Sequence, residues 1–287
     1  KGEGLGNQFL ANIRETDAIC HVVRCFENSD ILHVDGSVDA IRDAETINLE
    51  LIFADLETVE NRISKIEKKA IQGKDKDAKL EYDALKPIQE ALSKGLPARS
   101  VELTKEQKVL LKNFQLLTNK PMIYVANISE GDITNPDNNK EYVRLKEQAK
   151  IEGCAIIPVC ANIEADVAMI EDKDERSMFL EEFGIKESGL DKLIKTAYDI
   201  LGLETFLTGG SDECRAWTFK KGMTAPQCAG VIHTDFERGF IKAEVYHYND
   251  IHTYRTEQAI KEAGKYRIEG KDYVMKDGDV VFFRFNV

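Results

Sequence analysis

The apolar run at residues 122–126 constrains the fold more than any other stretch of this sequence. Short continuous apolar runs rich in β-forming residues are typical of strands buried on both faces of a parallel sheet. A helical pattern follows at residues 142–151, and a second apolar run follows at residues 154–161. A strand, a helix and a strand in this order predict a parallel crossover unit. We therefore expect an α/β domain in which this unit is the C-terminal half of a doubly wound sheet.

Two polar side chains, Asn127 and Glu130, follow the first apolar run at what would be the carboxyl end of its strand. Open α/β sheets bind ligands beyond this end of their strands. A side-chain amide and a carboxylate three positions apart could read a flat, hydrogen-bonding ligand such as a nucleobase. The alternative is an ordinary loop between a strand and a helix, in which Asn and Asp serve as turn residues. The four residues alone do not decide between these interpretations.

Composition limits the possible functions of the chain. With 51 acidic and 39 basic residues, the formal net charge of −12 argues against a protein that coats nucleic acid by bulk charge, so any RNA contact should be local. No apolar run approaches the roughly 18 residues of a membrane span, and we expect a cytoplasmic protein without a signal peptide. The six cysteines include no CxxC spacing and the five histidines form no metal signature. We expect neither a disulfide framework nor a zinc site.

A heptad pattern marks a different region from residue 49 onward. Its apolar positions recur at alternating intervals of three and four, and a second set follows a polar turn at residues 72–77. Two antiparallel helices would bury these sets against each other as a projecting hairpin, with a kink at Pro87. The first set is Leu49, Ile52, Leu56, Val59, Ile63, Ile66 and Ala70, and the second is Leu80, Ala84, Leu85, Ile88 and Leu92.

The remaining upstream segments predict short connecting elements. We expect a mobile glycine-rich loop at residues 1–7, a helix carrying Phe9 and Ile13, a strand at 18–24 and a surface connection at 26–43. Thr104 and Gln107 have the spacing of a capping box that opens a short helix through residue 117. A last helical pattern at 190–201 should end at Gly202.

From residue 203 the pattern changes to short strands separated by turns. We expect strands at 213–220, 230–234, 240–248 and 280–285, one helix at 259–263, and thus a small α+β domain. Five residues could form a local basic and aromatic surface, although a solvated strand face explains them more simply. They are Lys220, Lys221, Arg238, Lys242 and Tyr246. The expected domains are residues 1–48 with 118–202, the hairpin 49–117, and 203–287.

Taken together, these segments resemble the YchF or Obg-like ATPase family, a branch of the translation-factor class of P-loop NTPases. Residues 1–18 resemble its switch II and following helix, and the hairpin resembles its helical insertion. Residues 216–217, 231–236 and 278–287 resemble its C-terminal, β-grasp-like TGS domain. The site residues implied by the resemblance are Gly2, Glu3, Gly4 and Gly6 in switch II, Asn127, Ile128, Ser129 and Glu130 in the base-recognition motif, and Cys160, Ala161 and Asn162 in the loop behind the base.

The base-recognition motif carries its own chemical argument. Related GTPases use Asn-Lys-x-Asp, in which the Asp accepts hydrogen bonds from the N1 and exocyclic amine donors of guanine. Here Glu130 replaces the Asp and Ile128 replaces the Lys, whereas the Asn127 amide can still bond N7 and the six-position amine of adenine. In the family this pattern goes with ATP preferred over GTP. The resemblance thus implies an ATPase that uses Mg²⁺, with possible residual GTPase activity.

The phosphate-binding motif G-x-x-x-x-G-K-[ST] does not occur in the sequence, nor does the Asp-x-x-Gly that precedes switch II. We expect both, together with the Mg²⁺ ligands, upstream of Lys1, and the chain as it stands should not hydrolyse nucleotide. No catalytic residue is assigned, because His21 and His33 are more simply explained by structural roles.

Two alternatives to an ATP-hydrolysing enzyme remain open. One is a non-enzymatic docking module switched by nucleotide, and the other is a GTPase that prefers GTP. The expected partners are ATP and the ribosome or its RNA, contacted through the TGS domain and hairpin. We expect a monomer that binds neither DNA nor membranes.

Overall fold

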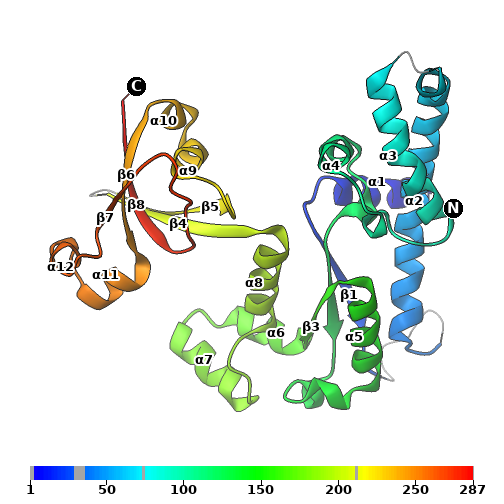
Figure 1. Cartoon of the computed structure of the whole chain (residues 1–287). Coiled ribbons are helices and arrows are strands. Elements are labelled where there is room, and N and C mark those ends of the chain that lie inside the picture. Colours follow the sequence, from blue (N-terminus) through cyan, green and yellow to red (C-terminus); the bar gives the residue numbers. More distant parts are fainter. Residues whose placement is uncertain (1–2, 29–35, 73–74, 211–212, 287) are drawn as a thin grey trace. The chain divides into compact units, whose positions relative to one another are not determined.

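The computed structural model describes residues 3–28, 36–72, 75–210 and 213–286. They belong to two compact units, Lys1–Ala197 and Tyr198–Val287 (Figure 1). Each unit has its own sheet. None of the helices in the described ranges is long and apolar enough to cross a membrane.

The first unit contains a three-stranded parallel sheet in the order β1-β2-β3. The strands are β1 (Ile19–Arg24), β2 (Met122–Asn127) and β3 (Ala155–Val159). The central strand β2 is buried along its length except at its last residue, as its continuous apolar run predicts. Helix α5 (Lys140–Glu152) connects β2 to β3, so the predicted parallel crossover unit is confirmed.

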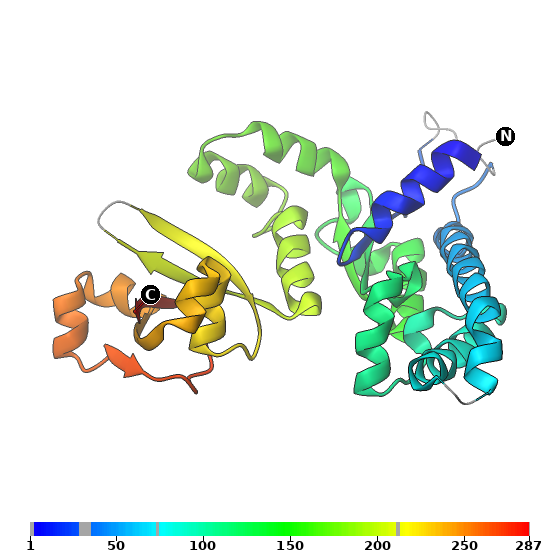
Figure 2. The same cartoon turned by 90° about the horizontal axis from the view of Figure 1, so that it is seen from above.

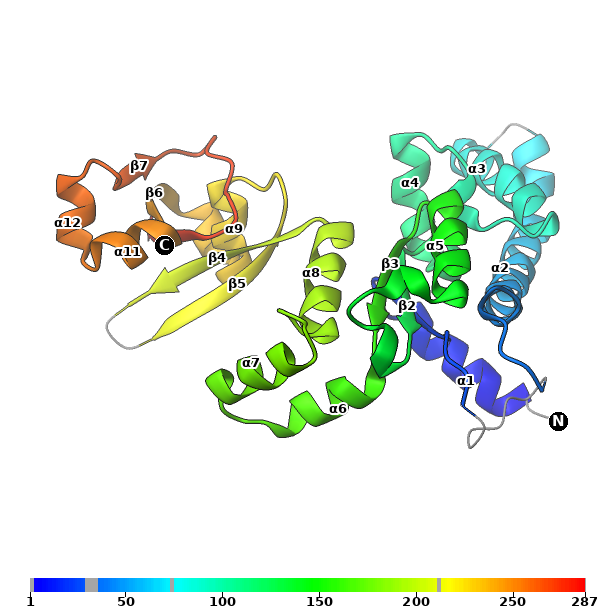
Figure 3. The same cartoon turned by 90° about the horizontal axis from the view of Figure 1, so that it is seen from below.

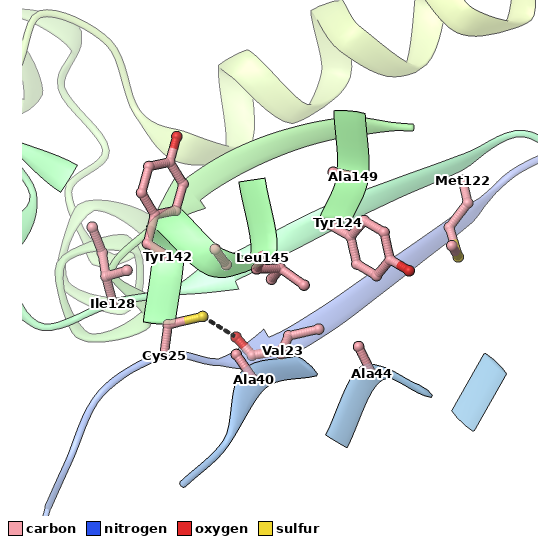
Figure 4. Close-up of a cluster of buried hydrophobic side chains, with 11 residues drawn as sticks. Val23, Cys25, Ala40, Ala44, Met122, Tyr124, Ile128, Tyr142, Leu145 and Ala149 are labelled. Carbon is pink, nitrogen blue, oxygen red and sulfur yellow. Dashed lines mark hydrogen bonds between the residues drawn. The ribbon is translucent and has the colours of Figure 1, made fainter. Parts of the chain in front are cut away.

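Two helices cover one face of this sheet and form its core (Figure 4). Ala40 and Ala44 belong to helix α2 (Ala40–Ile71), whereas Tyr142, Leu145 and Ala149 belong to α5. They pack against side chains of β1 and β2 and against Ile128, which is 1% exposed. The core therefore reaches the loop that follows β2.

Helices α2 (Ala40–Ile71) and α3 (Lys76–Ser93) form the predicted hairpin (Figures 1 and 2). Most of the heptad positions are buried, but Leu49 is 42% exposed, and α3 continues through Pro87. The expected surface connection is wrong in its last residues, because α2 already begins at Ala40. The Asp39 side chain accepts from the N–H groups of residues 41 and 42 and caps this early start. The buried residues of this contact are Ile52, Val59, Ile63, Ile66, Leu85, Ile88 and Leu92, with Ala98, Leu111 and Leu116 beside them.

Helix α1 (Glu3–Arg14) includes Gly4 and Gly6, so the expected loop is wrong for residues 3–7. Once the first turn exists, each further residue adds a hydrogen bond, and two glycines do not cost enough to stop the helix. The capping box of Thr104 and Gln107 is confirmed, although its helix α4 (Lys105–Leu111) ends before the expected position. Short 3₁₀ turns follow instead: η2 (Lys112–Phe114) and η3 (Leu117–Asn119), with η1 (Ala98–Ser100) before α4.

The regular elements that remain before residue 203 are helices and 3₁₀ turns, and the last helix crosses the boundary between the two units. Beyond β2 lie the 3₁₀ turns η4 (Glu130–Asp132) and η5 (Pro136–Asn138). Beyond β3 lie α6 (Ala161–Met169), α7 (Lys173–Glu182) and α8 (Gly189–Leu201). Gly202, with φ +61°, ends α8 as predicted.

The second unit has a mixed five-stranded sheet in the order β5-β4-β8-β6-β7, in which β4 and β8 are parallel. The strands are β4 (Leu203–Gly209), β5 (Cys214–Lys220), β6 (Phe240–His247), β7 (Arg267–Glu269) and β8 (Asp279–Phe285). Helix α9 (Ala225–Ile232) packs on one face and is followed by α10 (Thr234–Arg238) (Figure 2). Helices α11 (Tyr248–Tyr254) and α12 (Glu257–Glu262) follow β6 (Figure 3).

Two expectations for this unit are wrong. Residues 230–232 end α9 and Thr234 begins α10, so this segment is not a strand, and residues 259–263 are not the only helix among those described. The capping box of Thr224 and Gln227, with Pro226 inside it in the first turn, starts α9. Ala225, Cys228 and Ala229 then place three small, fully buried residues against the sheet.

Candidate functional site

Two loops that the sequence singles out meet at the carboxyl edge of the first unit's sheet. The base loop, residues 127–130, follows β2, and the backing loop, residues 160–162, follows β3. The backbone N–H of Ala161 donates to Oδ1 of Asn127 at 3.1 Å. The N–H of Ile128 donates to the Val159 carbonyl at 2.9 Å. The sheet and these two bonds hold the loops side by side.

The loops divide into buried supports and exposed polar groups. Ile128 and Cys160 are buried, and Ile128 packs in the sheet core. Glu130 and Asn162 are exposed, and Asn127 is half-buried. Because Ala161 bonds Oδ1 of Asn127, the amide NH₂ remains the donor end of this side chain for a ligand. The Ile128 N–H is already used by β3, so this residue cannot contact a base through that group.

Two residues that the sequence did not single out, Asp132 and Asn139, brace the base loop. Oδ2 of Asp132 accepts from the Ser129 hydroxyl at 2.7 Å and from Nδ2 of Asn139 at 2.9 Å. The same Nδ2 donates to the Cys25 carbonyl at 2.7 Å, just beyond β1. Asn139 also caps α5 through Oδ1, and this N-cap position was its only signal in the sequence. The brace ties the base loop to the start of α5 and to the residue that follows β1.

The expected switch II residues lie at the start of α1. Glu3, Gly4 and Gly6 are helical, whereas Gly2 lies outside the described residues. At the other end of this helix, Arg14 donates to Oδ1 of Asp55 at 3.4 Å and to Oγ1 of Thr58 at 3.2 Å. It also donates to the Gln115 carbonyl at 3.3 Å. These bonds attach α1 to the hairpin helix α2 and to the segment that leads back to β2.

The two histidines mentioned as weak candidates do not join the loops. His21 lies on β1 beside Tyr124, with ring centroids 5.4 Å apart, and Tyr124 precedes Asn127 by three residues. Burial lowers the pKa of His21, which favours the neutral ring. His33 lies outside the described residues.

Comparisons with known proteins identify relatives of the whole chain. The family model YchF-GTPase_C, described as a protein of unknown function (DUF933), matches residues 203–286. A protein of Bacillus subtilis named ribosome-binding ATPase YchF is 56% identical over all of this chain, which covers 78% of that relative. A protein of the same name from Escherichia coli O157:H7 is 50% identical over all of this chain, which again covers 78% of the relative.

A solved structure is also similar. The structure of the Schizosaccharomyces pombe YchF GTPase matches with a TM-score of 0.86 and 37% identity, over 99% of this chain and 76% of that one.

A mixed α/β unit with paired loops at its sheet edge, joined to a separate C-terminal unit, fits a P-loop NTPase with an additional domain. Within that class, the chain belongs to the YchF family.

Proposed function

We propose that the gene product hydrolyses ATP to ADP and phosphate, prefers ATP over GTP, and acts at the ribosome. The observation that carries the nucleotide part is the bond between the Ala161 N–H and Oδ1 of Asn127, which joins the two base-contacting loops. The relatives' name, ribosome-binding ATPase, supports both the reaction and the partner. We propose the ATPase activity for the full-length gene product, because the phosphate-binding motif is absent from these 287 residues.

The preference for adenine follows from hydrogen-bond matching. The Asn127 amide NH₂ donates to N7, and its Oδ1 has a second lone pair for the six-position amine. Guanine would present a carbonyl at the six position and donors at N1 and its two-amine. The Glu130 carboxylate, on a side chain one methylene longer than the Asp of related GTPases, is misplaced for those two donors. A donor left unpaired in a closed site costs about 1–3 kcal/mol, enough to reverse a preference.

The roles we assign to these residues concern binding and orientation. Asn127 and Glu130 read the base edge, Cys160 and Ala161 form the backing wall with Asn162, and Asp132 keeps Ser129 in place. The described residues gather no group of three His, Cys, Asp or Glu side chains that could hold a metal ion. Bound Mg²⁺ would supply charge neutralisation at the phosphates. We derive no step through it from these residues.

A second candidate function is a docking module whose conformation nucleotide switches. The bonds from Arg14 to α2 favour it, because they join the helix after the expected switch II to the hairpin. In this hypothesis helix α1, the hairpin and the second unit, taken as a TGS domain, act together on the ribosome, and hydrolysis only resets the state.

The experiment compares ATP and GTP binding and turnover in the full-length gene product and its Glu130→Asp variant. We expect the parent to favour ATP and the variant to lose at least roughly five-fold of that preference, as one regained guanine contact predicts. Glu171→Asp, a similar exchange at an exposed position outside both loops, is the matched control. A parent that binds GTP better than ATP would refute the base-reading argument.

Ribosome co-sedimentation in the presence of ATP and of ADP separates the two candidate functions. If the protein is an enzyme whose docking nucleotide does not control, it should bind ribosomes equally with ATP and with ADP. If it is a switched module, its ribosome binding should differ between the two nucleotides.

A further inference from the structure

The open face of the second unit's sheet has a pocket of about 610 Å³. Ala243, Val245 and Phe283 point into the core beneath α9. Because side chains alternate along a strand, their neighbours Glu244 and Phe282 point to the opposite face. Those neighbours line the pocket together with residues of α11 and α12.

Aromatic rings and cations are paired inside this pocket. The rings of Tyr246 and Tyr266 stack with centroids 5.8 Å apart. Nζ of Lys261 lies 4.4 Å from the Tyr266 centroid, and Cζ of Arg284 lies 4.2 Å from the Phe282 centroid. Phe282 lines the pocket and is 46% exposed, so part of its side chain is accessible to a ligand. Flat rings and flat guanidinium groups are the surfaces on which nucleobases stack.

Glu244 fixes this arrangement before any ligand arrives. Its carboxylate accepts from Nε and Nη2 of Arg284 at 3.1 and 3.4 Å and from the Tyr266 hydroxyl at 2.8 Å. Lys242 lies 3.4 Å away. These contacts hold the pKa of Glu244 at about 2, so the carboxylate stays charged and the Arg284 plane stays in place. A prearranged platform loses less entropy when it binds.

The charge of the pocket differs from that of the chain. Arg255, Lys261 and Arg284 line it together with two carboxylates, Glu244 and Glu257. Glu244 is compensated by the cations and hydroxyl just described, whereas the whole chain has a net charge of −12. Arg255 is held at φ +66°, a left-handed conformation rare for residues other than glycine, at the corner between α11 and α12.

We propose that this pocket binds an unpaired nucleobase of single-stranded RNA, with the base stacked on Phe282 and Arg284. The adjoining phosphates then contact Lys261 and Arg255. An acidic peptide would use the cations but would gain little from exposed ring faces, so the combination favours RNA. The proposal rests on the ribosome docking in the proposed function and not on its nucleotide chemistry.

The site differs from the basic surface that the sequence suggested. Of that set, Tyr246 lines the pocket and Lys242 contacts its carboxylate. Arg238 lies in α10, and Lys221 pairs with Glu204 at 3.6 Å. The decisive residues, Phe282 and Arg284, belong to β8.

The test measures RNA binding by the 287-residue chain without nucleotide. A fluorescein-labelled 12-nucleotide oligouridylate and a labelled RNA hairpin of matched length are titrated and followed by anisotropy. Phe282→Ala and Lys261→Ala should each weaken oligouridylate binding at least about five-fold, the lower end of what one stacked base contributes. The matched controls are Tyr248→Ala, an aromatic side chain of similar exposure (49%), and Lys265→Ala, both outside the pocket lining.

Support requires single-stranded RNA to bind more tightly than the hairpin and both pocket variants to weaken while both controls do not. Equal losses in pocket and control variants would overturn the proposal, as would no measurable binding of oligouridylate. Ribosome binding that depends on Phe282 without any binding of free RNA would assign the pocket to a protein partner and also overturn it. Because these titrations contain no nucleotide, their outcome does not depend on whether the protein prefers ATP over GTP.

Discussion

Replacing Asp55 by Asn should destabilise the first unit far more than an exposed acid-to-amide exchange does. Asp55 lies in α2 and is completely buried. Oδ1 accepts from the Leu117 N–H at 2.9 Å, and Oδ2 accepts from both the N–H and the hydroxyl of Thr118 at 2.7 Å. Arg14 adds a longer contact at 3.4 Å.

The size of the effect follows from counting the donors. An Asn side chain has one acceptor oxygen, so one backbone N–H of residues 117 and 118 faces an NH₂ group in either orientation. An unpaired buried N–H costs about 1–3 kcal/mol, and the bonds that remain lose their charge assistance. The Thr118 hydroxyl can rotate and accept from the new NH₂, which limits the loss. We therefore expect Asp55→Asn to lower the free energy of unfolding of the first unit by about 2–4 kcal/mol.

The assay uses two probes, because two units need not unfold together. The only tryptophan, Trp217, lies in the second unit, so its fluorescence follows that unit in urea. Far-UV circular dichroism follows the helices, which include the long hairpin of the first unit. Glu57→Gln, an exposed position two residues further along α2, is the control.

Asp55→Asn should shift the dichroism transition to lower urea and leave the Trp217 transition in place. A dichroism midpoint equal to that of the Glu57→Gln control would refute the donor count. A Trp217 transition that moves by the same amount would show that the loss is not confined to the first unit.

Two further predictions concern the second unit, both measured by the Trp217 transition. Gly239→Ala should lower the free energy of unfolding by about 1–3 kcal/mol, because its Cβ would lie 2.2 Å from the Asn286 carbonyl oxygen. Gly270→Ala, with open space around the Cβ, should be neutral. Equal effects of the two substitutions would contradict this argument. The pKa of Glu244 is lowered from 4.5 to about 2 in the folded state, so its stabilisation is present above pH 4.5 and is lost as the pH falls toward 2. Glu244→Gln should therefore flatten the loss of stability in that window, and an unchanged slope would contradict the assignment.

The sequence predicted those parts of the fold whose signal is local. The runs that became β2 and β3 are continuously apolar, and the hairpin positions recur at a regular spacing. The start of α2 was missed because Ala40 and Ala44, although buried, contribute little apolar character. Helix α9 was missed because Val231 and Ile232 suggest a strand, and only the capping box at Thr224 indicates otherwise.

The site was predictable in its loops and not in its supports. Asn127 and Glu130 could be found because they follow a recognisable strand. The brace of Asp132 and Asn139 depends on the carbonyl of Cys25, more than 100 residues away, and on no local pattern. The pocket of the second unit likewise combines Lys261 and Phe282 from different elements. Contacts of this kind exist only once the chain has folded.

Helix α2 takes part in two separate hydrophobic clusters. Ala40 and Ala44 pack in the sheet core, and Ile52 through Ile66 pack against α3. Its 32 residues span about 48 Å at 1.5 Å per residue. If the helix stays straight, a tilt of about 5° where it meets the sheet displaces its far end by about 4 Å. A tilt of α2 at Ala40 and Ala44 would therefore move the hairpin tip further than it moves the residues beside the sheet.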